Sequence, residues 1–152
     1  MSDLLASLKF DGRALINGQR VAAADGQTFD CISPVDGRLL TAVARCSQAD
    51  VHAAVASARA VFEAGKWSRM APAARKRIMI KFADQILAHA DELALTETLD
   101  MGKPIQYAKG VDVNSAANCI RWYGEATDKV YDEIAPTPRT ALALITREPV
   151  GV

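Results

Sequence analysis

The chain has 152 residues, of which 50% are hydrophobic and 24% are charged, and its 18 basic and 18 acidic side chains give no net charge. This composition is typical of a globular protein with a hydrophobic core, so it excludes a disordered or low-complexity chain. The neutral balance argues against nucleic acid or an anionic membrane as the main partner.

The first 46 residues predict strands and turns. Asn17 and Gly18 form the strongest short signal for a β-hairpin, because both central positions of such a turn need a positive φ. Residues 28–33 alternate apolar and polar side chains, and residues 38–45 are predicted to be the returning strand after a turn rich in proline and glycine.

Helical periodicity then replaces the strand pattern. Ser47 and Asp50 have the spacing of a capping box at a helix start, with Asp in the place of the usual Glu. Gly65 and Gly102 supply stop signals at helix ends. Four helices are predicted, over residues 48–64, 72–90, 91–101 and 111–129.

Two of these helices carry a face that should pack against a neighbour. In the second helix, the predicted buried stripe consists of Ile78, Phe82 and Ile86. In the fourth helix, a face of small and apolar residues predicts close helix packing. That face consists of Val113, Ala117, Ile120 and Gly124.

The last predicted element is a strand over residues 140–147 that is apolar on both faces. Such strands are normally covered on both sides. The short strands of the first third are its only expected partners within the chain, so we expect the strand to serve an interface or a sheet completed elsewhere. Since domains usually end on polar residues, the apolar end of the chain at residues 149–152 predicts a chain cut from a larger protein.

The sequence also predicts a cytoplasmic protein. No apolar stretch approaches the ~20 residues that span a bilayer. Asp3 stands where a secretory signal would carry basic residues. Cys31, Cys46 and Cys119 are an odd, scattered set, which favours reduced thiols over a disulfide framework.

No common catalytic or nucleotide-binding motif is present. The chain lacks G-x-G-x-x-G, a P-loop, H-E-x-x-H and C-x-x-C. His52 and His89 have polar neighbours, which favours solvated surface histidines. Glu97 and Asp100 could share a helix face as an acid pair, but solvated helix acids are favoured because nothing demands their burial.

Several segments, in the same order along the chain, resemble the amino-terminal part of the NAD(P)-dependent aldehyde dehydrogenase superfamily. The sequence around residues 121–131 is most similar to the bacterial γ-glutamyl-γ-aminobutyraldehyde dehydrogenases of putrescine breakdown. The segments that carry the resemblance are Ile-Asn-Gly at 16–18, Ile-Ser-Pro-Val-Asp-Gly at 32–37, the alanine-rich helix at 50–59, Trp-Ser at 67–68, Glu-Thr-Leu-Asp-Met-Gly-Lys-Pro at 97–104, Arg-Trp-Tyr at 121–123 and Arg-Glu-Pro-Val-Gly-Val at 147–152.

The resemblance implies an enzyme that oxidises an aldehyde to a carboxylic acid with NAD or NADP. In that family a cysteine attacks the aldehyde, hydride passes to the cofactor and a glutamate activates water. The nucleophile, the glutamate and the dinucleotide site would all lie beyond residue 152, and none of the three cysteines matches the nucleophile. The isolated chain is therefore expected to be inactive, with no catalytic or cofactor-binding residue of its own.

The implied fold is α/β, with short β-hairpins, four helices and then an oligomerisation strand. Residues 1–46 would form the amino-terminal strands and turns, and residues 47–135 the helical part of the cofactor-binding domain. Residues 136–152 would hold the oligomerisation strand, at 140–147, and the return to the cofactor-binding domain. This strand implies a homo-oligomer, either a dimer or a tetramer.

The resemblance also implies a structural monovalent cation. Its ligands would be the backbone carbonyls of Cys31 and Ile32 and the carboxylate of Asp100. Oxygen donors suit such a hard cation. The residues themselves leave the alternative of no ion open. They also leave open a different class of protein, a free-standing helical interaction module that pairs through its terminal strand.

Overall fold

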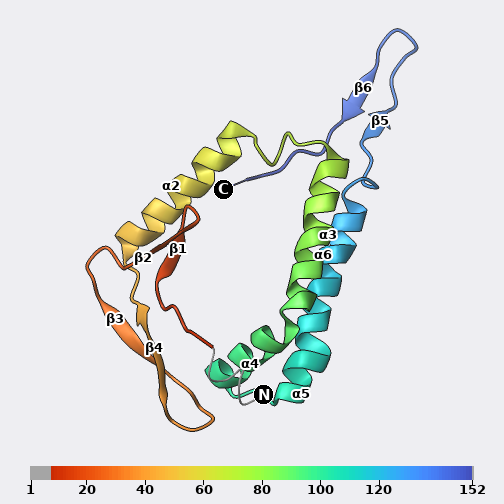
Figure 1. The fold of residues 1–152 in the computed structure, drawn as a ribbon. Coiled ribbons are helices and arrows are strands. Elements are labelled where there is room, and N and C mark those ends of the chain that lie inside the picture. Colours follow the sequence, from red (N-terminus) through yellow and green to blue (C-terminus); the bar gives the residue numbers. More distant parts are fainter. Residues whose placement is uncertain (1–7, 152) are drawn as a thin grey trace.

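The computed structural model describes residues 8–151, so Asp3 and Val152 lie outside the described part of the chain. In Figure 1 the two amino-terminal hairpins and helix α2 (Gln48–Ala64) lie on one side of an open frame. Helices α3 (Pro72–Ala88) and α6 (Asn114–Ala126) run side by side on the other, and the carboxyl-terminal hairpin projects away from them. None of the helices within residues 8–151 combines the length and the apolar character needed to cross a bilayer.

Two antiparallel hairpins form the amino-terminal part. Strands β1 (Ala14–Ile16) and β2 (Gln19–Val21) pair around the predicted turn, in which Asn17 has a φ of 52° and Gly18 a φ of 73°. Strands β3 (Thr28–Ile32) and β4 (Leu39–Ala44) also pair, as the alternating pattern predicts. Both predicted strand pairs are therefore confirmed.

Helix α2 (Gln48–Ala64) has both ends that the sequence predicts. Asp50 Oδ2 accepts hydrogen bonds from the backbone NH of Ser47, at 2.7 Å, and from its hydroxyl, at 2.9 Å. Asp50 Oδ1 accepts a third, from the backbone NH of Ala24 at 2.8 Å, which ties the helix start to the loop after β2. The helix ends at Gly65, whose φ of 69° is left-handed.

The main helix contact joins α3 (Pro72–Ala88) to α6 (Asn114–Ala126). Ala83 of α3 and Ala117 and Gly124 of α6 are buried there. The predicted small-residue face of the fourth helix is thus confirmed for Ala117 and Gly124. Ile120 is only half-buried, and Val113 lies in a separate cluster with Ala94 and Ala108.

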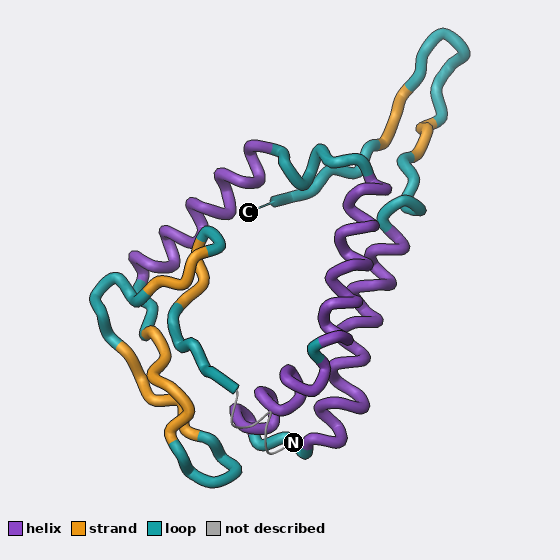
Figure 2. The backbone as a smooth tube through the Cα atoms, viewed as in Figure 1, coloured by secondary structure: helices purple, strands orange, loops and turns teal. Residues whose placement is uncertain are grey.

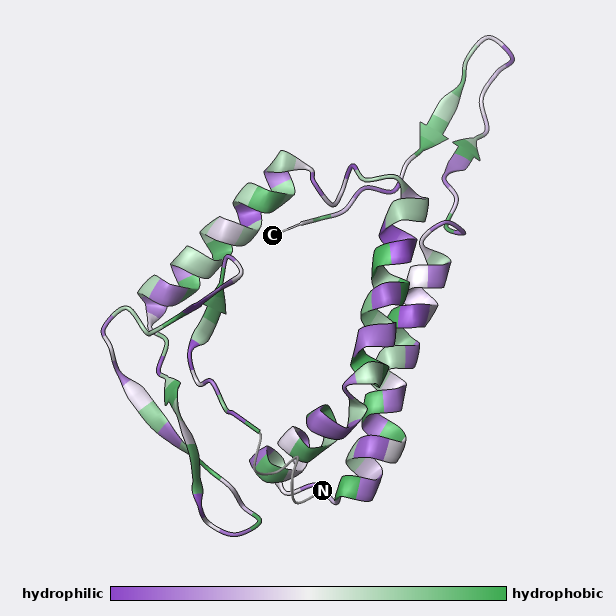
Figure 3. Ribbon diagram, in the orientation of Figure 1, coloured by the Kyte–Doolittle hydropathy of each residue, from purple (hydrophilic) through white to green (hydrophobic). Residues whose placement is uncertain are grey.

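The predicted stripe on α3 is wrong for two of its three residues. Ile78 is 47% exposed and Phe82 is 56% exposed, whereas Ile86 packs against the buried cluster of Ala94, Ala108 and Val113. Because α6 presents small residues, α3 turns its own small residue, Ala83, toward it, and this close approach leaves its larger apolar side chains uncovered. Apolar positions along both helices can be followed in Figure 3.

The fourth predicted helix, over residues 111–129, is longer at its start and shorter at its end. The helical segment begins at Ile105 and its last part, α6, ends at Ala126. Helix α4 (Ala90–Met101) stops at Gly102 as predicted, and α5 (Ile105–Tyr107) then leads through the π-helical segment η1 (Ala108–Val113) into α6. The side-chain amide of Asn114 donates to the carbonyls of Lys109, at 3.1 Å, and Gly110, at 3.2 Å. A side chain thus satisfies carbonyls of the widened turn, a feature that a 3.6-residue pattern does not predict.

The terminal strand β6 (Ala143–Ile145) pairs with β5 (Glu133–Ala135), not with the strands of the first third. The prediction that only the strands of the first third could pair with it was therefore wrong. The three residues of β5, followed by Pro136 and Pro138, form too short a pattern to indicate a strand. Figure 2 shows this hairpin standing apart from the helices.

Candidate functional site

The segment around Asp100 forms a rigid corner at the end of α4. Gly102 has a φ of 79°, and its NH donates to the carbonyl of Thr98 at 2.9 Å. A Cβ on Gly102 would lie only 3.1 Å from Cγ of Pro34, so the corner packs against the turn after β3. Two segments that the sequence singles out separately, 32–37 and 99–104, therefore meet in space.

Cys31 and Asp100 are in direct contact across this corner. The Cys31 thiol donates to Asp100 Oδ1 at 3.1 Å, although 69 positions separate the two residues. This hydrogen bond, together with partial burial and the negative charge of Asp100, raises the pKa of the Cys31 thiol. A protonated thiol is a poor nucleophile. The absence of a catalytic role for Cys31 stays a prediction.

The backbone next to this contact departs from a regular ladder. Cys31 pairs with Thr41 whereas Ile32 pairs with Leu39, so Leu40 is the extra residue of a β-bulge. A bulge disrupts the local ladder and leaves backbone groups without strand partners. The bulge therefore lies at the two residues whose carbonyls the resemblance assigns to a cation, and beside Asp100.

The charges at the corner also fit a cation. Asp100 occupies the last turn of α4, where helix carbonyls add negative potential, and that turn has no basic residue. The nearby Lys103 is engaged elsewhere, in ion pairs with Asp112 and, at 3.7 Å, with Glu97. No group of three or more His, Cys, Asp or Glu side chains within residues 8–151 could hold a metal ion, so backbone oxygens have to complete any site here.

The sequence analysis considered Glu97 and Asp100 only as an acid pair or as solvated acids, and it did not predict the ion pair between Glu97 and Lys103. Glu97 pairs with Lys103, while Asp100 contacts Cys31, so the two acids have different partners. The hydrogen bond to Asp112 is the main reason why the pKa of Lys103 is raised. His52 and His89 are exposed, as predicted.

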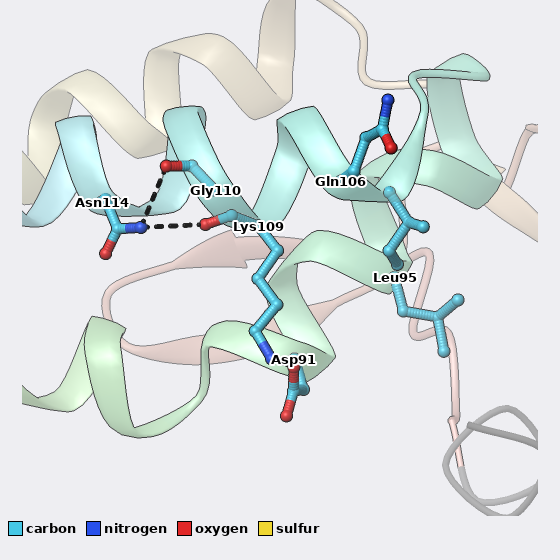
Figure 4. Close-up of a pocket in the computed structure, with 7 residues that line it drawn as sticks. Asp91, Leu95, Gln106, Lys109, Gly110 and Asn114 are labelled. Carbon is cyan, nitrogen blue, oxygen red and sulfur yellow. Dashed lines mark hydrogen bonds and ion pairs between the residues drawn. The ribbon is translucent and has the colours of Figure 1, made fainter.

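A hollow lies between α4 and η1 and was not predicted. Figure 4 shows Lys109 reaching from η1 to its ion-pair partner Asp91 on α4, with Leu95, Gln106 and Asn114 around them. Both charged side chains already have a partner, so the hollow offers no unpaired charged group at this position.

The β5–β6 hairpin leaves large apolar side chains uncovered. Leu142 is 72% exposed, Leu144 is 60% exposed and Ile134, which pairs with Leu144, is 72% exposed. Arg147 fastens the base of the hairpin: its NH donates to Asp132 Oδ1 at 3.0 Å and its guanidinium pairs with Glu133. Within the described residues no third strand joins this two-stranded sheet.

Comparisons with known proteins give one consistent result. Residues 21–152 match the aldehyde dehydrogenase family model. The chain is 49% identical to the Escherichia coli NADP/NAD-dependent aldehyde dehydrogenase PuuC over 150 residues, which are 99% of this chain and 30% of that protein.

Solved structures agree with this match. The Pseudomonas syringae indole-3-acetaldehyde dehydrogenase AldA, in complex with NAD+ and IAA, is 57% identical with a TM-score of 0.95, over 98% of this chain and 30% of that one. The Burkholderia cenocepacia γ-glutamyl-γ-aminobutyraldehyde dehydrogenase is 50% identical with a TM-score of 0.94, over 98% of this chain and 31% of that one. The chain thus spans about 30% of the length of the curated relative, and it belongs to the aldehyde dehydrogenase family.

Proposed function

We propose that this chain forms the amino-terminal third of an enzyme that oxidises an aldehyde to a carboxylic acid with NAD or NADP. The observation that carries the proposal is the family match over residues 21–152, together with the structural match to 98% of this chain. The chain spans about 30% of the length of these relatives, so the reacting groups are assigned to the remaining length.

In this proposal the chain supplies scaffold and interface. Residues 1–46 form the amino-terminal strands and turns, residues 47–135 the helical cover of the cofactor-binding domain, and residues 136–152 the oligomerisation strand and the return of the chain to that domain. The uncovered side chains of Ile78 and Phe82 on α3 support a covering role, because large apolar residues on a helix face are normally packed. The cytoplasmic location stays a prediction.

We assign self-association to the β5–β6 hairpin, giving a homodimer or homotetramer. Its apolar side chains are exposed on a two-stranded sheet, and two-stranded sheets are marginally stable unless something packs on them or extends them. An exposed strand edge is also a ready template for pairing with another chain.

The chemistry that NAD or NADP supplies when bound is the acceptance of a hydride, and no residue of this chain is assigned to it. The three cysteines have no assigned part in the reaction either. The pKa of the Cys31 thiol is raised, which disfavours the thiolate that a nucleophile needs.

We further propose that the corner at Asp100 holds a structural monovalent cation. The carboxylate of Asp100 and the carbonyls of Cys31 and Ile32 would be its ligands. The bulge at Cys31 and Ile32 and the lack of a basic residue in the last turn of α4 support this site. The ion would join the end of α4 to β3.

The substrate of the enzyme is proposed at the level of an aldehyde. The similarity to a γ-glutamyl-γ-aminobutyraldehyde dehydrogenase supports a role in putrescine catabolism, while the similarity to an indole-3-acetaldehyde dehydrogenase supports an aromatic aldehyde. The two substrates differ in charge and shape, so they can be compared directly in one assay.

The experiment replaces the matching segment of the E. coli relative with residues 21–152 of this chain and measures NADH and NADPH formation with both aldehydes. We expect an active chimera, since the fold of the segment is kept. A chimera that folds and assembles but oxidises neither aldehyde would contradict the proposal. The ratio of the two rates, compared with that of the unmodified relative, shows whether this segment influences substrate choice.

A further inference from the structure

The Asp100 carboxylate depends on a single side-chain contact in the described structure. Asp100 is exposed, and the hydrogen bond from the Cys31 thiol to Oδ1 at 3.1 Å is the only one that its side chain makes within residues 8–151. An exposed aspartate without a partner samples several rotamers, most of them directed into water. The thiol therefore selects one rotamer, in which the carboxylate lies against β3.

The local electrostatics would otherwise favour the solvent-facing rotamers. The carbonyl end of α4 repels a carboxylate in its last turn. Lys103, only three residues further along the chain, is held by Asp112 and Glu97. Arg13, which lines the same groove as Asp100, is paired with Asp11 at 2.7 Å. Within residues 8–151, the Cys31 thiol is therefore the donor that keeps the Asp100 carboxylate at the bulge.

We propose that Cys31 is a positioning residue for the monovalent cation: its thiol holds Asp100 Oδ1 so that the remaining carboxylate oxygen faces the ion. This inference rests on the proposed cation site. A carboxylate has two oxygens and several lone pairs, so one hydrogen bond to Oδ1 leaves Oδ2 free to bind an ion. Residues that orient a metal ligand in this way affect ion affinity without touching the ion through their own side chains.

The role predicts a difference between side chains that can donate and those that cannot. Cys31→Ser keeps a donor at the same place, whereas Cys31→Ala and the apolar, similarly shaped Cys31→Val remove it. Cys46→Ala is the matched control, because Cys46 is an exposed cysteine just before the N-cap of α2 and does not line the groove that Cys31 and Asp100 share. Asp100→Asn removes the charge that the ion would neutralise.

The experiment titrates each purified protein with sodium and potassium chloride at constant ionic strength, with choline chloride as the balancing salt. Ion binding is followed by sodium NMR line broadening and by the thermal midpoint of unfolding. We expect roughly fivefold weaker binding in Cys31→Ala and Cys31→Val, the effect of losing one weak orienting hydrogen bond. Cys31→Ser and Cys46→Ala should bind like the unmodified protein.

Two results would overturn the inference: one leaves the cation site in place, and the other removes it. If Cys31→Ala and Cys31→Val bind sodium as tightly as the unmodified protein while Asp100→Asn loses binding, the cation site stands and the role of Cys31 is wrong. If the unmodified protein and Asp100→Asn respond alike, there is no cation at this corner and the inference fails with the site. Should the substitutions prevent folding of the chain alone, the same series is measured in the chimera with the E. coli relative. Neither ion-binding result tests the proposed enzyme function, which is measured separately as aldehyde oxidation by the chimera.

Discussion

Gly124 of α6 lies against Met79 of α3 so closely that a Cβ atom on the glycine would be 3.0 Å from the Met79 Cβ. The carbonyl of Lys76 and the backbone nitrogen of Ile80 would each be 3.6 Å away, so backbone as well as side-chain atoms limit the space. The absence of a side chain at residue 124 therefore sets how closely the two helices approach.

Replacing Gly124 by valine should force these helices apart. We expect a loss of about 2 kcal/mol in the free energy of unfolding, the usual cost of overfilling a packed contact. Urea denaturation monitored by circular dichroism measures it. Gly110→Ala is the control: nothing lies within 4 Å of a Cβ there, and alanine should be neutral or stabilise the helix by up to about 1 kcal/mol. Equal destabilisation by both substitutions would contradict this packing.

The start of α2 should make the stability of the protein depend on acid pH. The backbone NH of Ser47 is the main cause of the lowered pKa of Asp50, which is only 6% exposed. A carboxyl whose folded pKa is lowered contributes stability that is fully present above its unfolded value, here 3.8. That stability is lost as the pH falls through the folded pKa.

Asp50→Asn tests this dependence. We expect the urea midpoint of the unmodified protein to fall more steeply than that of Asp50→Asn as the pH drops below 3.8. Asp30→Asn, at an exposed position of β3, serves as the control and should keep the steep dependence. Parallel pH profiles for all three proteins would show that the contacts of Asp50 do not stabilise the fold.

The Asp100 corner should be more sensitive to a side chain at Gly102 than an open turn is. Gly102 and Gly37 both have a left-handed φ, of 79° and 74°, so alanine costs about 1 kcal/mol of backbone strain at either position. Only Gly102 also has a close neighbour, Pro34. Gly102→Ala should therefore reduce the free energy of unfolding by about 1 kcal/mol more than Gly37→Ala. A difference near zero would mean that the corner and the turn after β3 do not touch.

A charge on the β5–β6 hairpin should prevent self-association. Leu144 is 60% exposed and pairs with Ile134 in the two-stranded sheet, so a lysine there would place a charge in any shared sheet. We expect the unmodified chain to sediment as a dimer or larger and Leu144→Lys as a monomer. Val130→Lys is the control, since Val130 is 63% exposed but lies outside both strands. Sedimentation that does not change with Leu144→Lys would assign the interface to another surface.

The sequence predicts best those features that are decided by residues close together along the chain. The turn at Asn17 and Gly18, the cap at Ser47 and Asp50, and the helix stops at Gly65 and Gly102 all appear as expected. In each, backbone conformation or a hydrogen bond within a few residues determines the result.

Features set by distant parts of the chain were predicted less well. The orientation of α3 depends on the small residues of α6, which begins 26 residues after α3 ends. The strand β5 exists because β6 pairs with it, and its three residues alone carry no strand pattern. The approach of Cys31 to Asp100 was reached only through resemblance to a family, because nothing in the spacing of two residues 69 positions apart indicates it.

We propose that this chain contributes scaffold and interface to an aldehyde dehydrogenase and none of the reacting groups. The most direct measurement is aldehyde-dependent formation of NADH or NADPH by the pure 152-residue chain, with the E. coli relative as the positive control. We expect no formation above the rate without protein, with either γ-glutamyl-γ-aminobutyraldehyde or indole-3-acetaldehyde as substrate. Turnover that depends on both aldehyde and cofactor, and that scales with the amount of chain, would contradict it.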